Sequence, residues 1–209
     1  MIAGTQTIYW SGVPSAYGTC SILATEKGVC WTGTPGTPVD EGILWVRRKF
    51  QVEHIVKGEK VAPLQQAVDE LRRYLEGEAL QFSCPLDLRG TAFQVAVWQE
   101  LTHIPYGQTR SYLEIARAIG QPTAVRAVGA ANGANPVAVI VPCHRVIGSN
   151  GKLTGYGGGL PTKEWLLSLE RATLHASSDQ PQDVGLSGEQ GEPMQRSQRY
   201  QVGQRPVVP

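Results

Sequence analysis

Two short helices around a tight turn are the feature that most constrains the fold of this chain. Ser111-Tyr112-Leu113-Glu114 has the pattern of a capping box, in which the serine hydroxyl and the glutamate carboxylate bind free backbone amides at a helix start. That helix stops at Gly120, and Pro122-Thr123 opens a second helix over about 124–131. The pattern predicts a helix-turn-helix.

Three further apolar segments lie in the same region. Thr91 can cap a helix that runs to about Leu101, and residues 161–174 predict a last helix. The apolar run 137–141 lies between them, is short enough for a buried strand and ends at Pro142. Residues 89–174 are therefore expected to form a mainly helical domain.

Residues 1–88 mix β-type runs with turn residues and predict a small α/β domain with a short antiparallel sheet. Residues 20–25 and 29–31 flank a glycine-containing turn, as in a hairpin, and residues 43–46 are a further candidate strand. Apolar residues at spacings of three and four predict a helix over 61–76, which Gly77 ends. The chain is thus expected to be an α+β protein with two small domains.

The C-terminal residues 175–209 are a third region, rich in Gln, Gly, Ser and Pro. Almost no apolar periodicity is present there, so burial cannot offset the entropy of ordering the segment. We expect these residues to be a disordered tail.

Charge is unevenly distributed along the chain, although the formal net charge is only +1. Residues 89–171 contain 8 basic and 4 acidic side chains, a balance of +4, whereas residues 1–88 contain 8 basic and 10 acidic side chains. The basic balance gives the second region an electrostatic reason to meet phosphate.

The sequence also constrains the cellular compartment of the protein and the chemical state of its cysteines. The longest apolar run, residues 137–141, is far shorter than the roughly 20 residues that cross a bilayer. The N-terminus lacks the basic and apolar parts of a secretory signal, so we expect a cytoplasmic protein with no membrane partner and with reduced cysteines. A metal site of Cys20, Cys30 and a histidine is an alternative, but no CxxC or HExxH pair supports it, and we expect neither a metal nor another cofactor.

Pro142-Cys143-His144 is the sharpest chemical feature. A thiol becomes a good nucleophile when a neighbouring base takes its proton, and His144 is adjacent in the chain. Glu170 shares a helix face with Leu166 and Leu167, so it should point inward and could orient His144. The alternatives are a structural cysteine beside a surface histidine, and a Glu170 that is exposed at a frayed helix end.

The second helix of the predicted helix-turn-helix has Arg126 in its first turn, where such motifs meet DNA. The helix is otherwise thin, with small residues such as Ala127, Gly129 and Ala130, so its backbone can approach a surface closely. Because long base-reading side chains are missing, the pattern favours a shape-seeking minor-groove binder over a sequence-specific reader. A small-residue helix packed on a neighbouring element is the alternative.

A series of segments, in order and in spacing, resembles the O6-alkylguanine-DNA alkyltransferase family. The segments are Phe93-Gln94-Val95-Ala96-Val97-Trp98, Pro105-Tyr106-Gly107, Thr109-Arg110-Ser111-Tyr112, Arg126-Ala127-Val128, Asn135-Pro136, Pro142-Cys143-His144-Arg145-Val146 and residues 151–170. The resemblance covers about residues 60–172 and is looser over 1–59. It implies a ribonuclease H-like sheet in the first domain. It also implies DNA repair in which the damaged nucleotide is flipped and a methyl or other alkyl group moves from O6-alkylguanine, or from O4-alkylthymine, to the protein's own cysteine.

The resemblance implies roles for the reacting residues. Cys143 would accept the alkyl group, His144 would take its proton through a water molecule, and Glu170 would orient His144. Asn135 would be the hinge asparagine that braces the active-site segment. Tyr112 would push the phosphate of the target nucleotide and donate a proton to the departing guanine. Because a thioether has no easy route to hydrolysis, each molecule would act once.

The resemblance also implies the residues that bind DNA and the base. Arg126 would fill the gap left by the flipped base, and a monomer would bind double-stranded DNA containing O6-alkylguanine. Tyr156, Gly157 and Gly158 would wall the pocket, and the carbonyls of Cys143 and Val146 would read the base amine. Gly157 departs from many relatives, which have a serine able to hydrogen-bond O6, so the reaction rate and the tolerance of bulky groups do not follow from the resemblance.

Three other functions fit parts of the pattern. A non-catalytic alkyltransferase-like protein would bind the lesion but lacks the acceptor cysteine, which is present here as Cys143. A cysteine hydrolase built on Cys143, His144 and Glu170 would turn over many times without DNA. A transcriptional regulator would need a defined operator, and the thin helix disfavours it.

Overall fold

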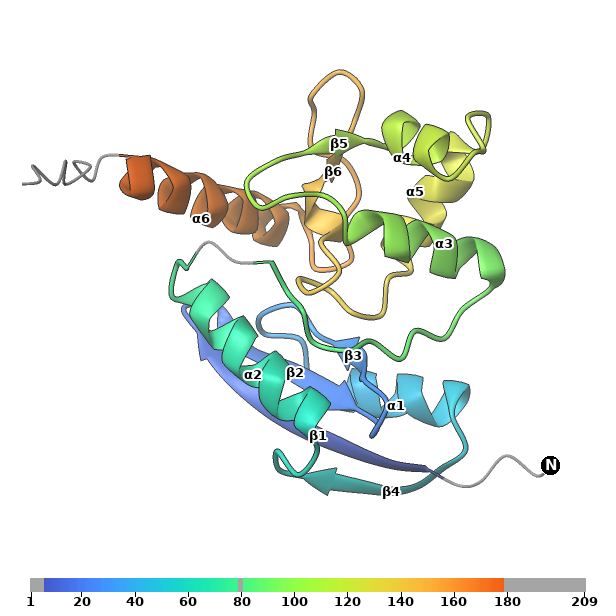
Figure 1. Cartoon of the computed structure of the whole chain (residues 1–209), viewed down its shortest axis with the longest axis vertical. Coiled ribbons are helices and arrows are strands. Elements are labelled where there is room, and N and C mark those ends of the chain that lie inside the picture. Colours follow the sequence, from blue (N-terminus) through green and yellow to red (C-terminus); the bar gives the residue numbers. More distant parts are fainter. Residues whose placement is uncertain (1–5, 79–80, 179–209) are drawn as a thin grey trace, which may run out of the picture. The chain divides into compact units, whose positions relative to one another are not determined.

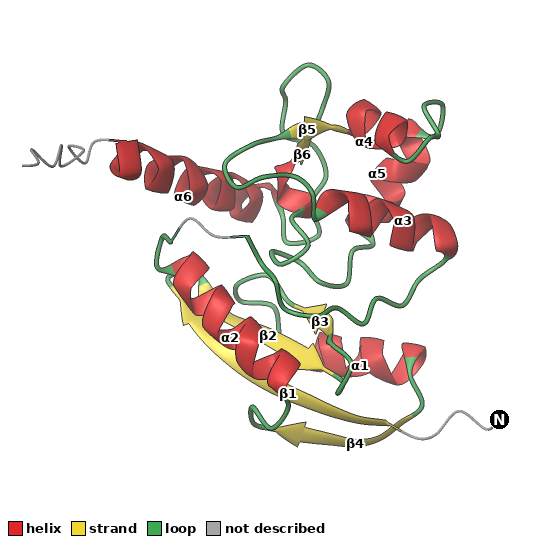
Figure 2. Cartoon of the chain, viewed as in Figure 1, coloured by secondary structure: helices red, strands yellow, loops and turns green. Residues whose placement is uncertain are grey.

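The computed structural model describes residues 6–78 and 81–178 (Figure 1). A four-stranded sheet with two helices is built from residues before 88, and the mainly helical part follows it (Figure 2). The predicted α+β class is confirmed. The predicted division at residue 88 stays a prediction, because buried apolar residues from both parts pack into one cluster.

The sheet has the strand order β3-β2-β1-β4. Its strands are β1 (Gln6–Ser15), β2 (Gly18–Ala24), β3 (Val29–Thr32) and β4 (Val52–Lys57). Strands β2 and β3 form the predicted antiparallel hairpin, and β1 pairs antiparallel with β2. The edge strand β4 runs parallel to β1, so the sheet is mainly rather than wholly antiparallel.

The strand predicted at residues 43–46 is wrong, because this segment lies inside helix α1 (Val39–Lys49). Pro38 precedes the helix, acidic side chains lie in its first turn and basic ones in its last turn, which suits the helix dipole. Gly42 and Val46 are buried four residues apart, as on one helix face. The short apolar run was therefore one turn of an amphipathic helix.

The two faces of the sheet bury different clusters. Cys20 faces the larger cluster together with helix α2 (Ala62–Leu75), which confirms the helix predicted over 61–76. Cys30 belongs to the smaller cluster on the α1 side. The two cysteines thus point to opposite faces, and no group of three potential metal ligands occurs within residues 6–78 and 81–178.

The helical part begins with α3 (Ala92–Leu101), which packs against α4 (Tyr112–Ala118) and α5 (Val125–Gly133). Both predicted helix starts are confirmed, since Thr91 and Ser111 each form a complete capping box. Gly120 follows α4 with a φ of 73°, a left-handed conformation that suits glycine. The predicted helix-turn-helix is thus present as α4 and α5.

The strand predicted at residues 137–141 is wrong, although the segment is buried as expected. The chain makes a tight turn here, with Val139 at a φ of 70°. The segment forms isolated bridges, of Val137 with Thr32 and of Ala138 with Val141, instead of a strand. Asn135 supplies further partners: its side chain accepts from the Val137 amide at 3.0 Å and donates to the Val141 carbonyl at 2.9 Å. Such a turn places the next residues, Pro142 and Cys143, at the inside of the molecule.

The last elements are the 3-10 turn η1 (Cys143–Arg145), the short parallel pair β5 (Arg110–Ser111) and β6 (Val146–Ile147), and helix α6 (Leu160–Ser178). Because α6 continues to Ser178, the prediction that disorder begins at residue 175 is wrong for 175–178, which continue the helical turns that begin at Leu160. The rest of the predicted tail, 179–209, lies outside the described residues. None of the described helices is long and apolar enough to cross a membrane.

Candidate active site

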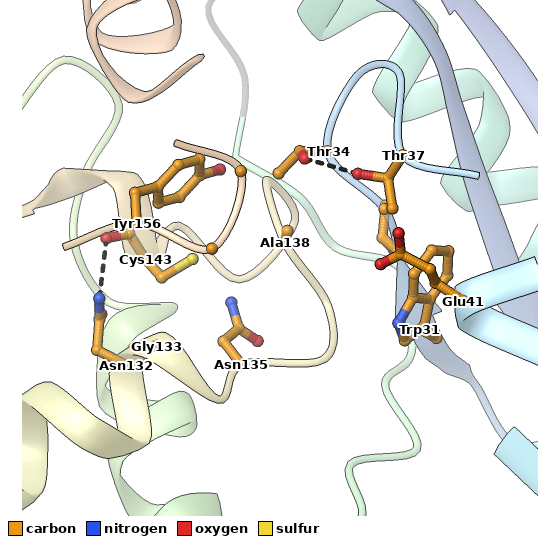
Figure 3. A pocket seen from close by; sticks show the side chains of 14 residues that line it. Trp31, Thr34, Thr37, Glu41, Asn132, Gly133, Asn135, Ala138, Cys143 and Tyr156 are labelled. Atoms are coloured by element: carbon orange, nitrogen blue, oxygen red, sulfur yellow. Dashed lines mark hydrogen bonds between the residues drawn. The ribbon is translucent and has the colours of Figure 1, made fainter. Parts of the chain in front are cut away.

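Cys143 lies at the first position of η1 and borders a cavity of about 170 Å³. The turn at 137–141 and Pro142 deliver the cysteine there, and only 4% of its surface is exposed. Asn135 and Tyr156 line the same cavity (Figure 3), and so do Gly157 and Gly158. The structure therefore brings together the thiol and four of the residues that the sequence analysis proposed for the site.

His144 and Glu170 form a fully buried pair behind the cysteine, with 2.8 Å between Nε2 and Oε1. An ionised carboxylate can only accept hydrogen bonds, so the imidazole proton must be on Nε2. Nδ1 is also buried and makes no hydrogen bond to any described residue. The pair thus leaves a neutral imidazole nitrogen free to accept a proton.

Glu170 is held as an anion by several donors. Arg145 donates to it through Nε and Nη2, the latter at 2.9 Å, and the Gly107 amide donates at 2.9 Å. Burial alone would raise the pKa of Glu170, but His144 and Arg145 outweigh burial and bring it to about 2. Burial lowers the pKa of His144 against the opposing effect of Glu170, which favours the neutral base.

The thiol of Cys143 is protonated at rest. Burial raises its pKa, although a hydrogen bond from Asn135 and the charge of Lys163 act in the other direction. Because the thiolate is the nucleophile, a thiol of this kind reacts only when a base removes its proton. His144 follows it directly in the chain, and its buried Nδ1 without a hydrogen-bond partner among the described residues makes it the candidate base.

Lys163 is a buried site residue that the sequence analysis missed. Its ammonium donates to the Val146 carbonyl at 2.6 Å and to the Thr154 carbonyl at 2.9 Å. Lys163 lies seven residues before Glu170 on the same helix face, and two charged residues on one apolar stripe could have signalled a buried site. The Val146 carbonyl, which the sequence analysis expects to bind the base amine, thus already accepts one hydrogen bond, from Lys163.

The residues expected to meet DNA lie on α4 and α5. Arg126, Ala127 and Ala130 are exposed. Gly129 packs beside the Tyr112 ring, and the Tyr112 hydroxyl donates to the Thr154 carbonyl at 3.2 Å. Among the described residues that line the cavity, neither Tyr112 nor Arg126 is included. The two side chains therefore lie outside the lining of the cavity.

One wall of the cavity comes from the N-terminal part of the chain, which the sequence analysis did not expect. Trp31, Thr34, Thr37 and Glu41 line it opposite Cys143 (Figure 3). The hydroxyls of Thr34 and Thr37 lie 2.8 Å apart. The end of β3 is joined to the active-site turn by the Thr32 amide, which donates to the Pro136 carbonyl at 2.9 Å. No local sequence pattern marks these residues, because only tertiary pairing brings them to the cavity.

Comparison with known proteins assigns both parts of the chain. Residues 8–88 match the ribonuclease-like domain of 6-O-methylguanine DNA methyltransferase, and residues 92–172 match its DNA-binding domain. An inducible methylated-DNA–protein-cysteine methyltransferase of Bacillus subtilis is 47% identical over 171 residues, covering 82% of this chain and 94% of the relative. The chain belongs to the 6-O-methylguanine DNA methyltransferase family.

Further relatives agree with this assignment. The methylated-DNA–protein-cysteine methyltransferase of Mycobacterium tuberculosis is 63% identical over 110 residues, or 53% of this chain and 67% of the relative. The crystal structure of Mycobacterium tuberculosis OGT in complex with DNA superposes with a TM-score of 0.66 at 43% identity, covering 79% of this chain and 94% of that one. The resemblance and the ribonuclease-like first domain expected from the sequence are confirmed.

Gly158 of this methyltransferase is expected to tolerate no side chain. A Cβ there would lie 2.6–2.9 Å from three side-chain atoms of Thr34, which is only 8% exposed and cannot swing away. We expect Gly158→Ala to lower the free energy of unfolding by about 1–3 kcal/mol and to slow the reaction of Cys143. Thermal denaturation and reaction rates would measure both effects.

Gly157 provides the matched control, because a Cβ there meets only the Gly133 carbonyl at 3.9 Å. Gly157→Ala should leave stability within about 0.5 kcal/mol of the parent. The Thr34→Gly change, which also removes the Cβ of Thr34 that would lie 2.9 Å away, should restore a Gly158→Ala protein. Equal stabilities for the two alanine variants would contradict the contact with Thr34.

Proposed function

We propose that this methyltransferase repairs double-stranded DNA by moving the alkyl group of O6-alkylguanine, and of O4-alkylthymine, onto Cys143. The observation that carries the proposal is the arrangement around Cys143: a thiol at a cavity, next to a histidine base that a buried carboxylate orients. The protein acts as a monomer, and each molecule acts once.

The reaction balances with the groups of this chain alone. The Cys143 proton passes to Nδ1 of His144, directly or through a water molecule, and the sulfur attacks the alkyl carbon. The S–C bond forms as the C–O6 bond breaks, and the electron pair remains on the purine. The purine gains a proton from Tyr112, so that a protein thioether and an unmodified guanine result.

Base flipping makes the alkyl carbon accessible. The O6 group lies inside the stacked duplex, whereas Cys143 lies at the base of a cavity. Alkylation at O6 weakens pairing with cytosine, so the lesion is easier to extrude than a normal guanine. The thin helix α5 can then lie in the groove, with the exposed Arg126 filling the gap. Binding to the minor groove would bring the cavity opening to the flipped base.

The proposed role of Arg126 can be tested by an experiment that separates base flipping from the alkyl-transfer step. Arg126→Ala should slow alkyl transfer from a lesion in a duplex by about 10- to 100-fold, a cost of a few kcal/mol for unfilled stacking. The same variant should react with the free base O6-benzylguanine at the parent rate, since no duplex has to be opened. Arg117→Ala, which alters another exposed arginine on α4, is the control.

The alternatives predict other outcomes in this experiment. A lesion binder without transfer would show no adduct from either substrate. A cysteine hydrolase would turn over repeatedly and would ignore DNA. Equal losses of Arg126→Ala on duplex and free base would contradict the proposed role of the arginine.

A further inference from the structure

A tyrosine from the N-terminal part of the chain reaches the buried histidine–glutamate pair. Tyr74 lies in the last turn of α2, and its side chain is fully buried. Its hydroxyl donates to Glu170 Oε1 at 2.8 Å and lies 3.4 Å from His144 Nε2. Tyr74 thus touches the oxygen that holds the imidazole.

Packing alone does not account for this hydroxyl. The Tyr74 ring continues the buried stripe of α2 and contacts the rings of Phe82 and Tyr106, with centroids 5.4 and 5.8 Å away. A phenylalanine would fill the same space. The oxygen adds only hydrogen bonds, and its partners among the described residues are the two groups of the pair.

We propose that Tyr74 is a positioning residue for alkyl transfer, which tunes His144 as a base by sharing the Glu170 oxygen that binds the imidazole. The proposal deepens the proposed function and rests on it. It makes the ribonuclease-like part of the chain a contributor to the reaction rather than only a support.

The physical reason is competition for one carboxylate oxygen. Glu170 Oε1 accepts from the Tyr74 hydroxyl, from His144 Nε2 and from the Arg145 guanidinium. Each donor disperses the negative charge, so each weakens the hold of Glu170 on the other donors. Loss of the tyrosine hydroxyl should therefore strengthen the His144–Glu170 bond and favour the imidazolium form.

The other charged groups around His144 do not change in this comparison. They are Glu170 and Lys163 from α6 and Arg145 from η1. Burial and Glu170 raise the pKa of Tyr74 well above its usual value, so the phenol stays protonated and remains a donor throughout the working range. The effect of the hydroxyl can therefore be isolated by removing it.

The test is the pH dependence of the single-turnover alkyl-transfer rate in Tyr74→Phe. We expect the acid limb of the profile to move upward by roughly 0.5–1 pH unit. At a given pH on the acid limb, the rate of the variant should be about 3- to 10-fold lower than that of the parent. Above pH 8, the rate of the variant should equal or exceed that of the parent. A residue with only a structural role would lower the rate equally at every pH.

A second variant should move the acid limb of the pH profile in the opposite direction. Incorporation of 3-fluorotyrosine at position 74 keeps the ring and strengthens the donor, so the acid limb should move downward. Tyr9→Phe on β1 removes a hydroxyl outside the pair and should leave the profile unchanged. Thermal denaturation would show that each variant is folded.

A titration of the His144 imidazole by NMR tests the same inference without any transfer reaction. The pKa of His144 should be higher in Tyr74→Phe than in the parent, and an unchanged pKa would overturn the role of Tyr74. A parent protein that forms no adduct would instead count against the proposed function, so the two failures are distinguishable.

Discussion

Replacement of Glu170 by glutamine is expected to lower the free energy of unfolding by about 3–5 kcal/mol. Glu170 neutralises the guanidinium of Arg145, which is only 3% exposed, and it binds the buried His144. A neutral amide of the same shape leaves the buried arginine charge without its counter-charge. Urea denaturation of the two proteins at pH 7 would measure the loss.

The pH dependence of this difference follows from the pKa of Glu170. The folded-state pKa of about 2 lies below the ordinary value of 4.5, so the carboxylate stabilises the fold above about pH 4.5. That contribution is lost as the pH falls toward 2, and the difference between Glu170→Gln and the parent should shrink accordingly. Glu164→Gln, at an exposed position of the same helix, should change stability little. A loss below 1 kcal/mol at pH 7 for Glu170→Gln would contradict the pairing.

Replacement of His144 by asparagine is expected to slow alkyl transfer by about 10²- to 10⁴-fold, the usual contribution of a general base. The Cys143 thiol has a raised pKa and is rarely ionised without help. The rate of the variant should also rise with pH as hydroxide replaces the base. Single-turnover rates at saturating lesion DNA would measure this change.

The affinity of His144→Asn for lesion DNA is the control for its effect on the rate. This affinity should stay close to that of the parent, because His144 is fully buried and is not among the described residues that line the cavity. His103→Gln, which alters an exposed histidine, should leave the rate unchanged. A rate for His144→Asn within about threefold of the parent would contradict the role of His144 as the base.

Local patterns were sufficient where one segment determines its own structure. The capping boxes at Thr91 and Ser111 set their helix starts, and the apolar stripe of α6 placed Glu170 inside the protein. The prediction that Glu170 meets His144 needed only that stripe and the need of a buried carboxylate for a partner. Their roles in the reaction remain proposals.

Patterns failed where tertiary contacts override local preference. The buried run at 137–141 is a turn because the Asn135 side chain satisfies its backbone groups. The parallel pairing of β4 with β1 depends on residues far apart in the chain. Tyr74 and Thr34 reach the site only through the packing of the first part of the chain on the second, which no periodicity reveals.

The most direct measurement of the central claim is the intact mass of the protein after mixing with a duplex that contains one O6-methylguanine. We expect a gain of one CH₂ that saturates at one per protein. Peptide mapping should place the added group on Cys143, and Cys143→Ala should abolish the gain. Tight binding to the lesion without any adduct, or an adduct on another residue, would contradict the claim.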